Sequence, residues 1–446
     1  MTKIRKFNYK SLEELKDEIK RLDLDIPVID NLDNLKETVD LGGGSVVPNR
    51  LAIHPMEGAD ANPDGTPGGL NIRRYLRYAA GGSGLIWFEA MAINEMGRAN
   101  DMQCFLNKDT VGDFKEMIKQ LRREAKEVYG EEFNPYLVIQ LTHVGRFGRH
   151  NKILFHHDLV DNAAAANINP DHPLMKDEEL ERLEDYFVEA AQLAKEAGFD
   201  AVDIKACHRY LLSENLAAHT REGKYGGDYQ SRTRLMKNAV KKVSETVDID
   251  LATRLNIYDA IPYPYGWGAD EEGNEKHDEP RKLVRELDAL GVKLINITAC
   301  TPYLWPHINR PYDLPSNIGY EPPEHPLIGV ERLLRLARIT SEETTNAKVV
   351  GTGYSYLREY APYVAAAVVE KGWSDFIGFG RQAFAYPDFA KDIIYNDGLE
   401  KKKVCVTCSK CAELKAKKKH TGCVVRDREI YVPIYQELLR EYKAQE

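Results

Sequence analysis

The sequence predicts a (β/α)8 TIM barrel that is followed by a short cysteine-rich segment. Eight runs rich in Val, Ile and Leu alternate with amphipathic helical stretches. Such near-continuous apolar runs are typical of parallel strands that are covered on both faces. Eight strand–helix units are the number that closes this barrel. A doubly wound sheet is the alternative, but no G-x-G-x-x-G turn follows the first run, which disfavours it.

The chain divides into three parts. Residues 1–45 are expected to form an N-terminal helical extension, 46–398 the barrel, and 399–446 the C-terminal segment. The turn-forming string LGGGSVVPNR (41–50) leads into the barrel. The expected strands are 50–56, 84–93, 136–144, 201–207, 250–257, 293–300, 347–354 and 374–381. Between them, 111–128 and 179–198 have the apolar spacing of helices that pack on one face.

Composition excludes several classes of protein. The chain has 446 residues, 43% of them hydrophobic, and a net charge of −9. This acidity argues against nucleic acid as a partner, because phosphate-binding surfaces are basic. The first 20 residues contain no apolar core of a signal peptide, and no apolar run of about 20 residues occurs, so we expect no membrane span. The clustered, odd number of cysteines disfavours a secreted disulfide framework. We therefore expect a cytoplasmic protein.

Polar side chains and glycines gather where the expected strands end, which is where barrels place their chemistry. They are His54, Glu57, Glu89, Gln140, His143, Lys205, His208, Tyr210, Arg254, Gly351, Gly353, Gly380 and Arg381. Glycines after the last two strands let backbone N–H groups approach a phosphate closely. Arg381 adds a charge-assisted contact there. The pattern predicts a phosphate-bearing ligand at this end.

Four of the seven cysteines lie in VCVTCSKCAELKAKKKHTGC (404–423). They are Cys405, Cys408, Cys411 and Cys423. Zinc modules more often use two separated C-x2-C pairs, whereas three close thiols and a distant fourth are typical of a [4Fe–4S] cluster. We therefore favour an iron–sulfur segment, and zinc stays the alternative. Cys104, Cys207 and Cys300 fall in or beside expected elements, where a free cysteine is a small buried hydrophobe.

Several strings, from NRLAIHPMEG (49–58) to GFGRQAFAYPDFA (378–390), resemble the old yellow enzyme family of FMN-dependent oxidoreductases. The most specific is YGGDYQSRTR (225–234), although the family has Asn where Ser231 stands. The resemblance implies FMN as cofactor. The residues that it places on the flavin are Pro55, Met56, Glu57, Ala90, Gln140 and Arg254, with Gly353, Gly380 and Arg381 on the phosphate.

A subgroup of this family has a [4Fe–4S] cluster directly after the barrel, and it includes 2,4-dienoyl-CoA reductase and trimethylamine dehydrogenase. The position of the four cysteines matches that arrangement. Those relatives continue into a dinucleotide-binding portion, whereas only 23 residues follow Cys423 here. We therefore expect the cluster either to hold the C-terminal segment to the barrel or to pass electrons to an external carrier. The flanking lysines would suit an acidic ferredoxin, flavodoxin or electron-transfer flavoprotein.

The substrate end departs from the family pattern. Relatives carry His-x-x-His or His-x-x-Asn on the fourth strand, and a tyrosine two residues later supplies a proton. Here Lys205 replaces the first histidine, while His208 and Tyr210 persist. An ammonium group suits a carboxylate or a developing enolate. Two long aromatic segments, 258–280 and 301–326, are expected to form a lid, from which His307 is a candidate substrate contact.

The resemblance implies reduction of an activated C=C bond in an enone or enoate, by hydride from flavin N5 with Tyr210 as proton donor. Oxidation of an amine or C–H substrate, with electrons leaving through the cluster, is a second hypothesis. A non-redox hydrolase or lyase with a zinc-binding tail is the third. The electron donor is NAD(P)H or a ferredoxin- or flavodoxin-type carrier. We also expect a small-molecule substrate and a homo-oligomer.

Overall fold

Eight parallel strands close into a barrel in this computed structural model, which describes residues 6–313 and 315–445. The strands are β3 (Leu51–Ile53), β4 (Leu85–Ala92), β5 (Tyr136–Thr142), β6 (Ala201–Ile204), β7 (Asp250–Tyr258), β8 (Val292–Ala299), β9 (Lys348–Gly351) and β10 (Phe376–Phe379). β10 pairs with β3, which closes the ring. The predicted TIM barrel is confirmed, and each expected strand range overlaps one of these strands, with β7 and β8 each extending one residue beyond it. Residues 1–5, 314 and 446 of the expected parts lie outside the described residues.

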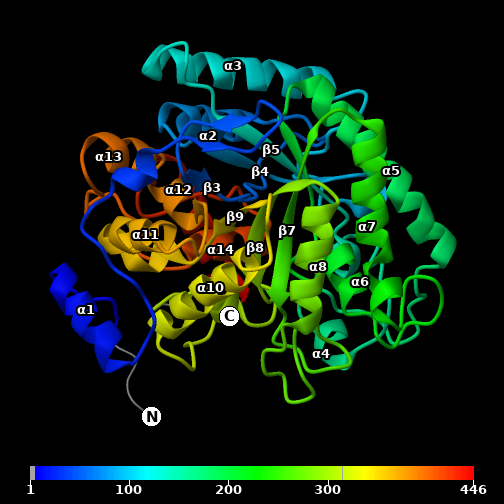
Figure 1. Cartoon of the computed structure of the whole chain (residues 1–446). Helices are drawn as coiled ribbons and strands as arrows, with labels where there is room; N and C mark the ends of the chain where they lie inside the picture. Colours follow the sequence, from blue (N-terminus) through cyan, green and yellow to red (C-terminus); the bar gives the residue numbers. More distant parts are fainter. Residues whose placement is uncertain (1–5, 314, 446) are drawn as a thin grey trace.

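Helices surround the strands, which explains why β4 and β5 are buried along their whole length (Figure 1). The long ones are α2 (Gly69–Ala80), α3 (Val111–Tyr129), α5 (Asp177–Ala197), α7 (Tyr229–Thr246), α8 (Asp278–Ala289), α10 (Pro326–Ser341) and α11 (Ala361–Glu370). α3 and α5 match the two expected helices to within two residues at each end. No described helix is long and apolar enough to cross a membrane.

A short hairpin covers the amino end of the barrel. It joins β1 (Val39–Asp40) to β2 (Val46–Val47) through the glycines of the LGGGS string. Gly42, Gly43 and Gly44 all have positive φ, which residues with a side chain adopt only with strain. Val39 and Val47 pack with inward-facing strand residues in one apolar cluster. Packed apolar side chains therefore close the amino end of the barrel, and the polar carboxyl ends of the strands lie on the other side.

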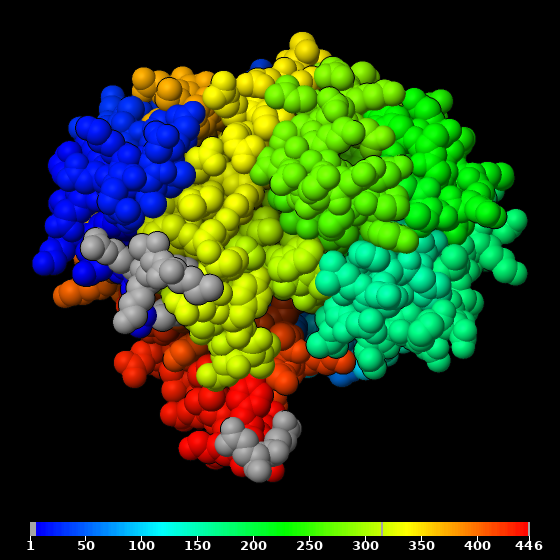
Figure 2. Space-filling view, turned by 90° about the horizontal axis from the view of Figure 1, so that it is seen from below, coloured from blue at the N-terminus to red at the C-terminus, as the bar shows by residue number. Residues whose placement is uncertain are grey.

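The two terminal parts pack on the barrel. In the N-terminal part, α1 (Leu12–Arg21) buries Leu15 and Ile19 in the main core, and η1 (Asp33–Lys36) follows it. After the barrel, α14 (Lys410–Ala416) and α15 (Arg428–Gln445) form a small core of their own. In Figure 2 this red C-terminal segment projects beside the yellow-green segment that precedes α10. Asn317 Nδ2 donates to Glu413 Oε1 at 3.1 Å across that contact.

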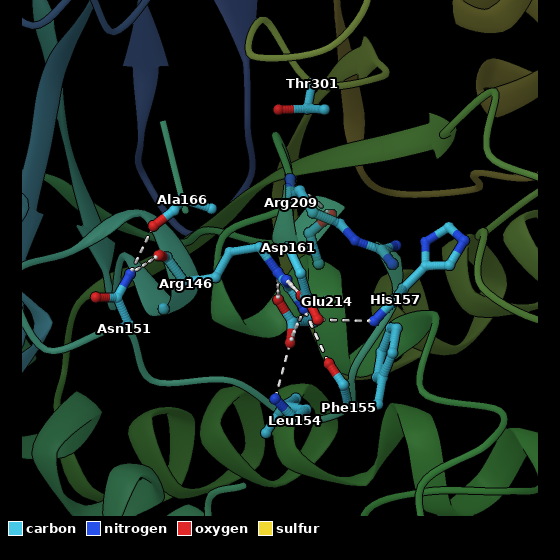
Figure 3. Close-up of polar contacts among 12 residues, drawn as sticks. Arg146, Asn151, Leu154, Phe155, His157, Asp161, Ala166, Arg209, Glu214 and Thr301 are labelled. Carbon is cyan, nitrogen blue, oxygen red and sulfur yellow. Dashed lines mark hydrogen bonds and ion pairs between the residues drawn. The ribbon is translucent and has the colours of Figure 1, made fainter. Parts of the chain in front are cut away.

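A buried ion-pair network holds the long segment between β5 and α5 (Figure 3). The fully buried Arg146, in η3 (Gly145–Phe147), lies 2.5 Å from Asp161 in α4 (Asp158–Asp161). Its Nε lies 2.5 Å from Glu214 in α6 (Leu211–Leu216). Glu214 also accepts the Leu154 N–H at 2.8 Å. Because α6 directly follows Tyr210, this network fixes the loop at the end of β6.

We predict that Arg146→Leu lowers the free energy of unfolding by about 3–5 kcal/mol, because it leaves two buried carboxylates without their counter-ion. Chemical denaturation measures this change. Arg149→Leu is the matched control, since the ion pairs of Arg149 with Glu95 and Asp101 are exposed and their loss should cost at most about 1 kcal/mol. Equal effects of the two substitutions would contradict the structural role of Arg146.

Candidate functional site

One buried carboxylate organises the ends of β5, β6 and β7. Asp203 Oδ2 accepts hydrogen bonds from Gln140 Nε2 at 2.6 Å and from Trp87 Nε1 at 2.8 Å. Its Oδ1 accepts the backbone N–H of Arg254 at 2.7 Å. The structure thus brings Gln140 and Arg254 together through Asp203. The Arg254 side chain is buried and its Nε has no partner among the described residues. Burial lowers the pKa of Arg254.

Pro55 and Met56 follow β3, and Ala90 belongs to the neighbouring β4. Ala90 follows an irregularity in the β4–β5 pairing and is the register partner of Gln140. Met56 lies against Gly380, where an added Cβ would meet its Sδ at 2.9 Å. The absence of a side chain at Gly380 therefore allows the end of β10 to approach the end of β3.

Two arginines approach each other from different strand ends, since Arg381 follows β10 and Arg310 lies in the segment that follows β8. Arg381 begins α12 (Arg381–Ala385), and its Nη2 donates to the Pro311 carbonyl at 2.7 Å. Its Nη1 and the Nη1 of Arg310 are buried without a hydrogen-bond partner among the described residues. Burial, and then the charge of Arg381, lower the pKa of Arg310 to about 10. Gly353, with φ of 104°, leads into η4 (Tyr354–Tyr360) on the same side of the barrel.

Lys205, His208 and Tyr210 lie on the loop that follows β6. The ammonium of the buried Lys205 sits 3.7 Å from the centre of the Tyr210 ring, a cation–π contact. His208 turns elsewhere, since its Nε2 lies 3.1 Å from Asn309 Nδ2. Burial raises the pKa of Tyr210 well above its usual value and lowers those of Lys205 and His208. Tyr210 is therefore a phenol and His208 a neutral imidazole at neutral pH.

Tyr210 belongs to a wider polar group. Its hydroxyl donates to Glu57 Oε1 at 3.3 Å and lies 3.1 Å from the hydroxyl of Tyr303. Glu57 Oε2 lies 2.7 Å from the ammonium of Lys415, which comes from α14. Burial favours the neutral form of Glu57, but the charges of Lys415 and Lys205 oppose it and keep the pKa of Glu57 below its usual value. Two lysines thus face one carboxylate.

His307 lies apart from this group in the short helix α9 (Pro306–Asn309). Its Nδ1 lies 2.6 Å from the hydroxyl of Tyr320 in the same lid segment. Burial lowers the pKa of His307.

The four cysteines of the C-terminal segment line one cavity together with Arg381 and Phe384. The Thr407 N–H points to Cys405 Sγ at 3.4 Å, and the backbone N–H groups of residues 425 and 426 lower the pKa of Cys423 against the larger effect of burial. Among the described residues, no three His, Cys, Asp or Glu side chains converge as ligands of a single metal ion. Cys104, Cys207 and Cys300 are buried elsewhere, as predicted.

Sequence reasoning missed Tyr303, Arg310 and Lys415. Tyr303 and Arg310 belong to the expected lid segment 301–326, in which His307 was the only predicted contact. Lys415 is one of the lysines that flank the four cysteines. The sequence did contain a signal that separates Lys415 from the other lysines. Residues four apart share a helix face, and Lys415 is four residues after Cys411.

The sequence profile of the NADH:flavin oxidoreductase / NADH oxidase family matches residues 38–289. The chain belongs to this family. It is therefore a flavin-dependent oxidoreductase, which confirms the predicted resemblance and shows that the non-redox hydrolase or lyase hypothesis was wrong. The family's FMN is the cofactor that the barrel end has to accommodate.

Relatives within this family differ in length. The NADPH dehydrogenase of Listeria monocytogenes is 31% identical over 255 residues, which are 56% of this chain and 69% of that protein. The NADH oxidase of Thermoanaerobacter brockii and the metal reductase of Desulforamulus reducens are 25% and 26% identical, over 82% and 84% of this chain. These matches span only 52% and 51% of those two proteins.

Solved structures share the fold at low identity. A 2-naphthoyl-CoA reductase complex superposes with a TM-score of 0.69 at 20% identity, covering 89% of this chain and 57% of that one. Histamine dehydrogenase from Rhizobium sp. 4-9 gives 0.65 at 19% identity, with 88% and 52% covered. Morphinone reductase gives 0.60 at 20% identity, with 80% and 88% covered. At these identities, the solved structures show only that the barrel fold is shared.

The residues present fit FMN. Arg254, whose backbone shares the Asp203 carboxylate with the Gln140 amide, offers a buried guanidinium, and the unpartnered nitrogens of Arg310 and Arg381 suit a phosphate. When bound, FMN supplies hydride chemistry. We propose that Gln140 and Arg254 hold its ring system and that Arg381, with Gly353 and Gly380 and with Arg310 beside it, holds its phosphate.

We predict that Arg381→Ala weakens FMN binding by about 1.5–3 kcal/mol, the contribution of one charge-assisted hydrogen bond. Flavin retained after dialysis, followed by titration with FMN, measures the change. Arg381 also lines the cysteine cavity, so iron is measured in the same samples. Full FMN retention with loss of iron would assign Arg381 to the cysteines and contradict its phosphate role.

Proposed function

We propose that the protein is an FMN- and [4Fe–4S]-dependent reductase of an activated carbon–carbon double bond that is conjugated to an anionic group. One observation carries the proposal, which is the phenolic Tyr210 beside the buried ammonium of Lys205 at the barrel mouth. A reductase of this kind needs a proton donor next to a positive charge, because negative charge develops on the substrate as the bond is reduced.

Tyr210 is suited to protonate the α-carbon of such a substrate. Its raised pKa keeps the proton on the hydroxyl until a strongly basic carbon is present. Tyr303, 3.1 Å from the same oxygen, donates a hydrogen bond to it once that proton has left. Lys205 stabilises the phenolate through the face of the ring.

His208 serves as a neutral hydrogen-bonding group in this proposal. Its backbone N–H donates to Asn256 at 3.2 Å and its carbonyl accepts the Thr301 hydroxyl at 3.0 Å. Asn309 holds its ring, so His208 connects the β6 loop to the lid segment. The remaining sequence candidate, His307, is retained as a contact of the outer part of the substrate.

Dehydrogenation of an amine is the second candidate function, and some structural neighbours are named for such reactions. The charges at the site disfavour it. Lys205, Lys415 and Arg254 surround His208 and all lower its pKa, after the larger effect of burial. A protonated amine would be repelled by these groups, and Glu57 is already paired with Lys415.

The cysteine cavity supports a cluster over zinc. A tetrahedral zinc requires four sulfurs within about 2.3 Å of one point, whereas a cubane spreads its thiolates over four iron atoms. The four thiols share one cavity, yet no three of the described ligand-type side chains converge on a single ion. Backbone N–H groups directed at Cys405 and Cys423 are the outer contacts that tune such a centre.

Electron supply belongs to the proposal as well. NADPH and NADH in the names of the relatives support a nicotinamide donor, and an external carrier is the alternative. The lysines expected to dock that carrier are partly neutralised, since Lys401, Lys403 and Lys419 pair with Glu359, Glu400 and Glu441. This favours NAD(P)H. The expected homo-oligomer stays a prediction.

We predict that Cys408→Ser abolishes iron–sulfur absorption and loosens residues 400–445, because cluster binding is coupled to the folding of its segment. Visible spectra with iron and zinc analysis test the first part, and hydrogen exchange tests the second. Cys104→Ser, a change at a buried cysteine outside the cavity, is the control. A variant with full iron, or a wild-type protein with stoichiometric zinc, would contradict the assignment.

We predict that Lys205→Met lowers kcat/KM for an enoate by about tenfold or more, the factor expected when one charged contact is lost, without changing the flavin spectrum. Tyr210→Phe should lower kcat/KM for every alkene by removing the proton donor. Lys205→His should recover turnover of neutral enones. Wild-type turnover of an enoate by Lys205→Met, or oxidation of only amines by the wild type, would rule out the proposed reaction.

A further inference from the structure

The C-terminal segment reaches into the substrate end of the barrel. Lys415 on α14 extends to Glu57, which follows β3 and is far from Lys415 in the sequence. The Lys415 ammonium lies 2.7 Å from Glu57 Oε2. The Lys415 side chain is 36% exposed and the Glu57 side chain 10%. This pair therefore lies where the barrel mouth meets solvent.

The Glu57 side chain contacts the groups that would bind the carboxylate of a ligand. One of its oxygens accepts from the Tyr210 hydroxyl at 3.3 Å and the other meets Lys415 at 2.7 Å. Lys205 lies within electrostatic reach of it, over the Tyr210 ring. A phenol and two ammonium groups thus surround one carboxylate, which leaves an excess of positive charge.

We infer that Lys415 and Lys205 form an anion subsite for the carboxylate of the substrate, and that the side chain of Glu57 is an internal stand-in for that carboxylate. The inference rests on the proposed function and adds to it a specificity-determining residue from outside the barrel. Binding of substrate then requires the Glu57 carboxylate to give up Lys415 and the Tyr210 hydroxyl. Tyr210 becomes free to donate its proton only when an anionic substrate has replaced Glu57.

Lys415 is not what holds the C-terminal segment in place, so it can be changed without detaching the segment. Arg73 and Arg77 of α2 each pair with Asp427 at 2.7 Å. The Thr421 N–H donates to the Gly58 carbonyl at 2.7 Å. His420 Nδ1 lies 2.8 Å from the Ala59 carbonyl oxygen. These contacts fix the segment to α2 and to the loop after β3 without Lys415.

The test compares two probes of the same shape, cinnamate and its neutral amide cinnamamide. Calorimetry on the holoenzyme without reductant measures their binding, so the result does not depend on turnover. We expect the wild type to prefer cinnamate. Lys415→Met should weaken cinnamate binding by about tenfold and leave cinnamamide binding unchanged. Lys415→Arg should keep the preference, and Lys418→Met, which removes an exposed charge from the same segment, should match the wild type.

Glu57→Gln should change the affinity for cinnamate in the opposite direction to Lys415→Met. This distinguishes an anion subsite from a purely structural ion pair. If Glu57 competes with the substrate carboxylate, this variant binds cinnamate more tightly than the wild type. A structural pair predicts instead that Glu57→Gln and Lys415→Met both lower thermal stability and leave the probe preference unchanged. Lower stability with an unchanged probe preference would overturn the subsite. Equal binding of both probes by the wild type, or a preference of the wild type for phenethylamine, would overturn it as well. Preference for cinnamate without alkene turnover would retain the subsite and reject the proposed reaction.

Discussion

An excess of buried and partly buried positive charge at the carboxyl end of the barrel is the constraint on which the rest of the site depends. Lys205, Arg254 and Lys415 approach one another there, and Arg310 and Arg381 form a second group. Glu57 and Asp203 oppose the first group directly. Burying like charges is expensive unless they are paired. Anions that enter this region would stabilise the charged forms of these groups, and the flavin phosphate and the anionic substrate that we propose are such anions.

The scaffold uses separate carboxylates to position these cations. Asp203 binds the backbone of Arg254 and the Gln140 amide and leaves the guanidinium free. Arg146 pairs with Glu214 and Asp161 outside the mouth. Arg209 pairs with Asp259 at 3.0 Å and donates to the Tyr265 carbonyl at 2.6 Å, which connects the β6 loop to the first lid segment. The ion pairs that hold the loops are therefore distinct from the cations left available to ligands.

Much of the barrel was predictable because its signals are local. Each strand is a short apolar run, and the residues that end the strands are brought together by the closure of the sheet, whatever the loops do. Tyr303 and Lys415 were not predictable in the same way. Their positions depend on how a lid of 26 residues (301–326) and a C-terminal segment fold back over the mouth, which is set by contacts such as Asn317–Glu413 and Arg73–Asp427. Likewise, the YGG…R-x-R string indicated the family but not the contacts of its arginine. Arg232 binds the Leu216 carbonyl and Glu279, and these contacts hold the scaffold.

The glycine-turned hairpin that covers the amino end of the barrel has a kinetic consequence. Its valines fill that end together with the inward side chains of the strands, so traffic of small molecules is confined to the opposite opening. In the reaction that we propose, the reductant and the alkene would then share one opening, over which the lid and the C-terminal segment fold. Two molecules that share one opening would occupy the site in alternation, as a reaction in two successive halves requires.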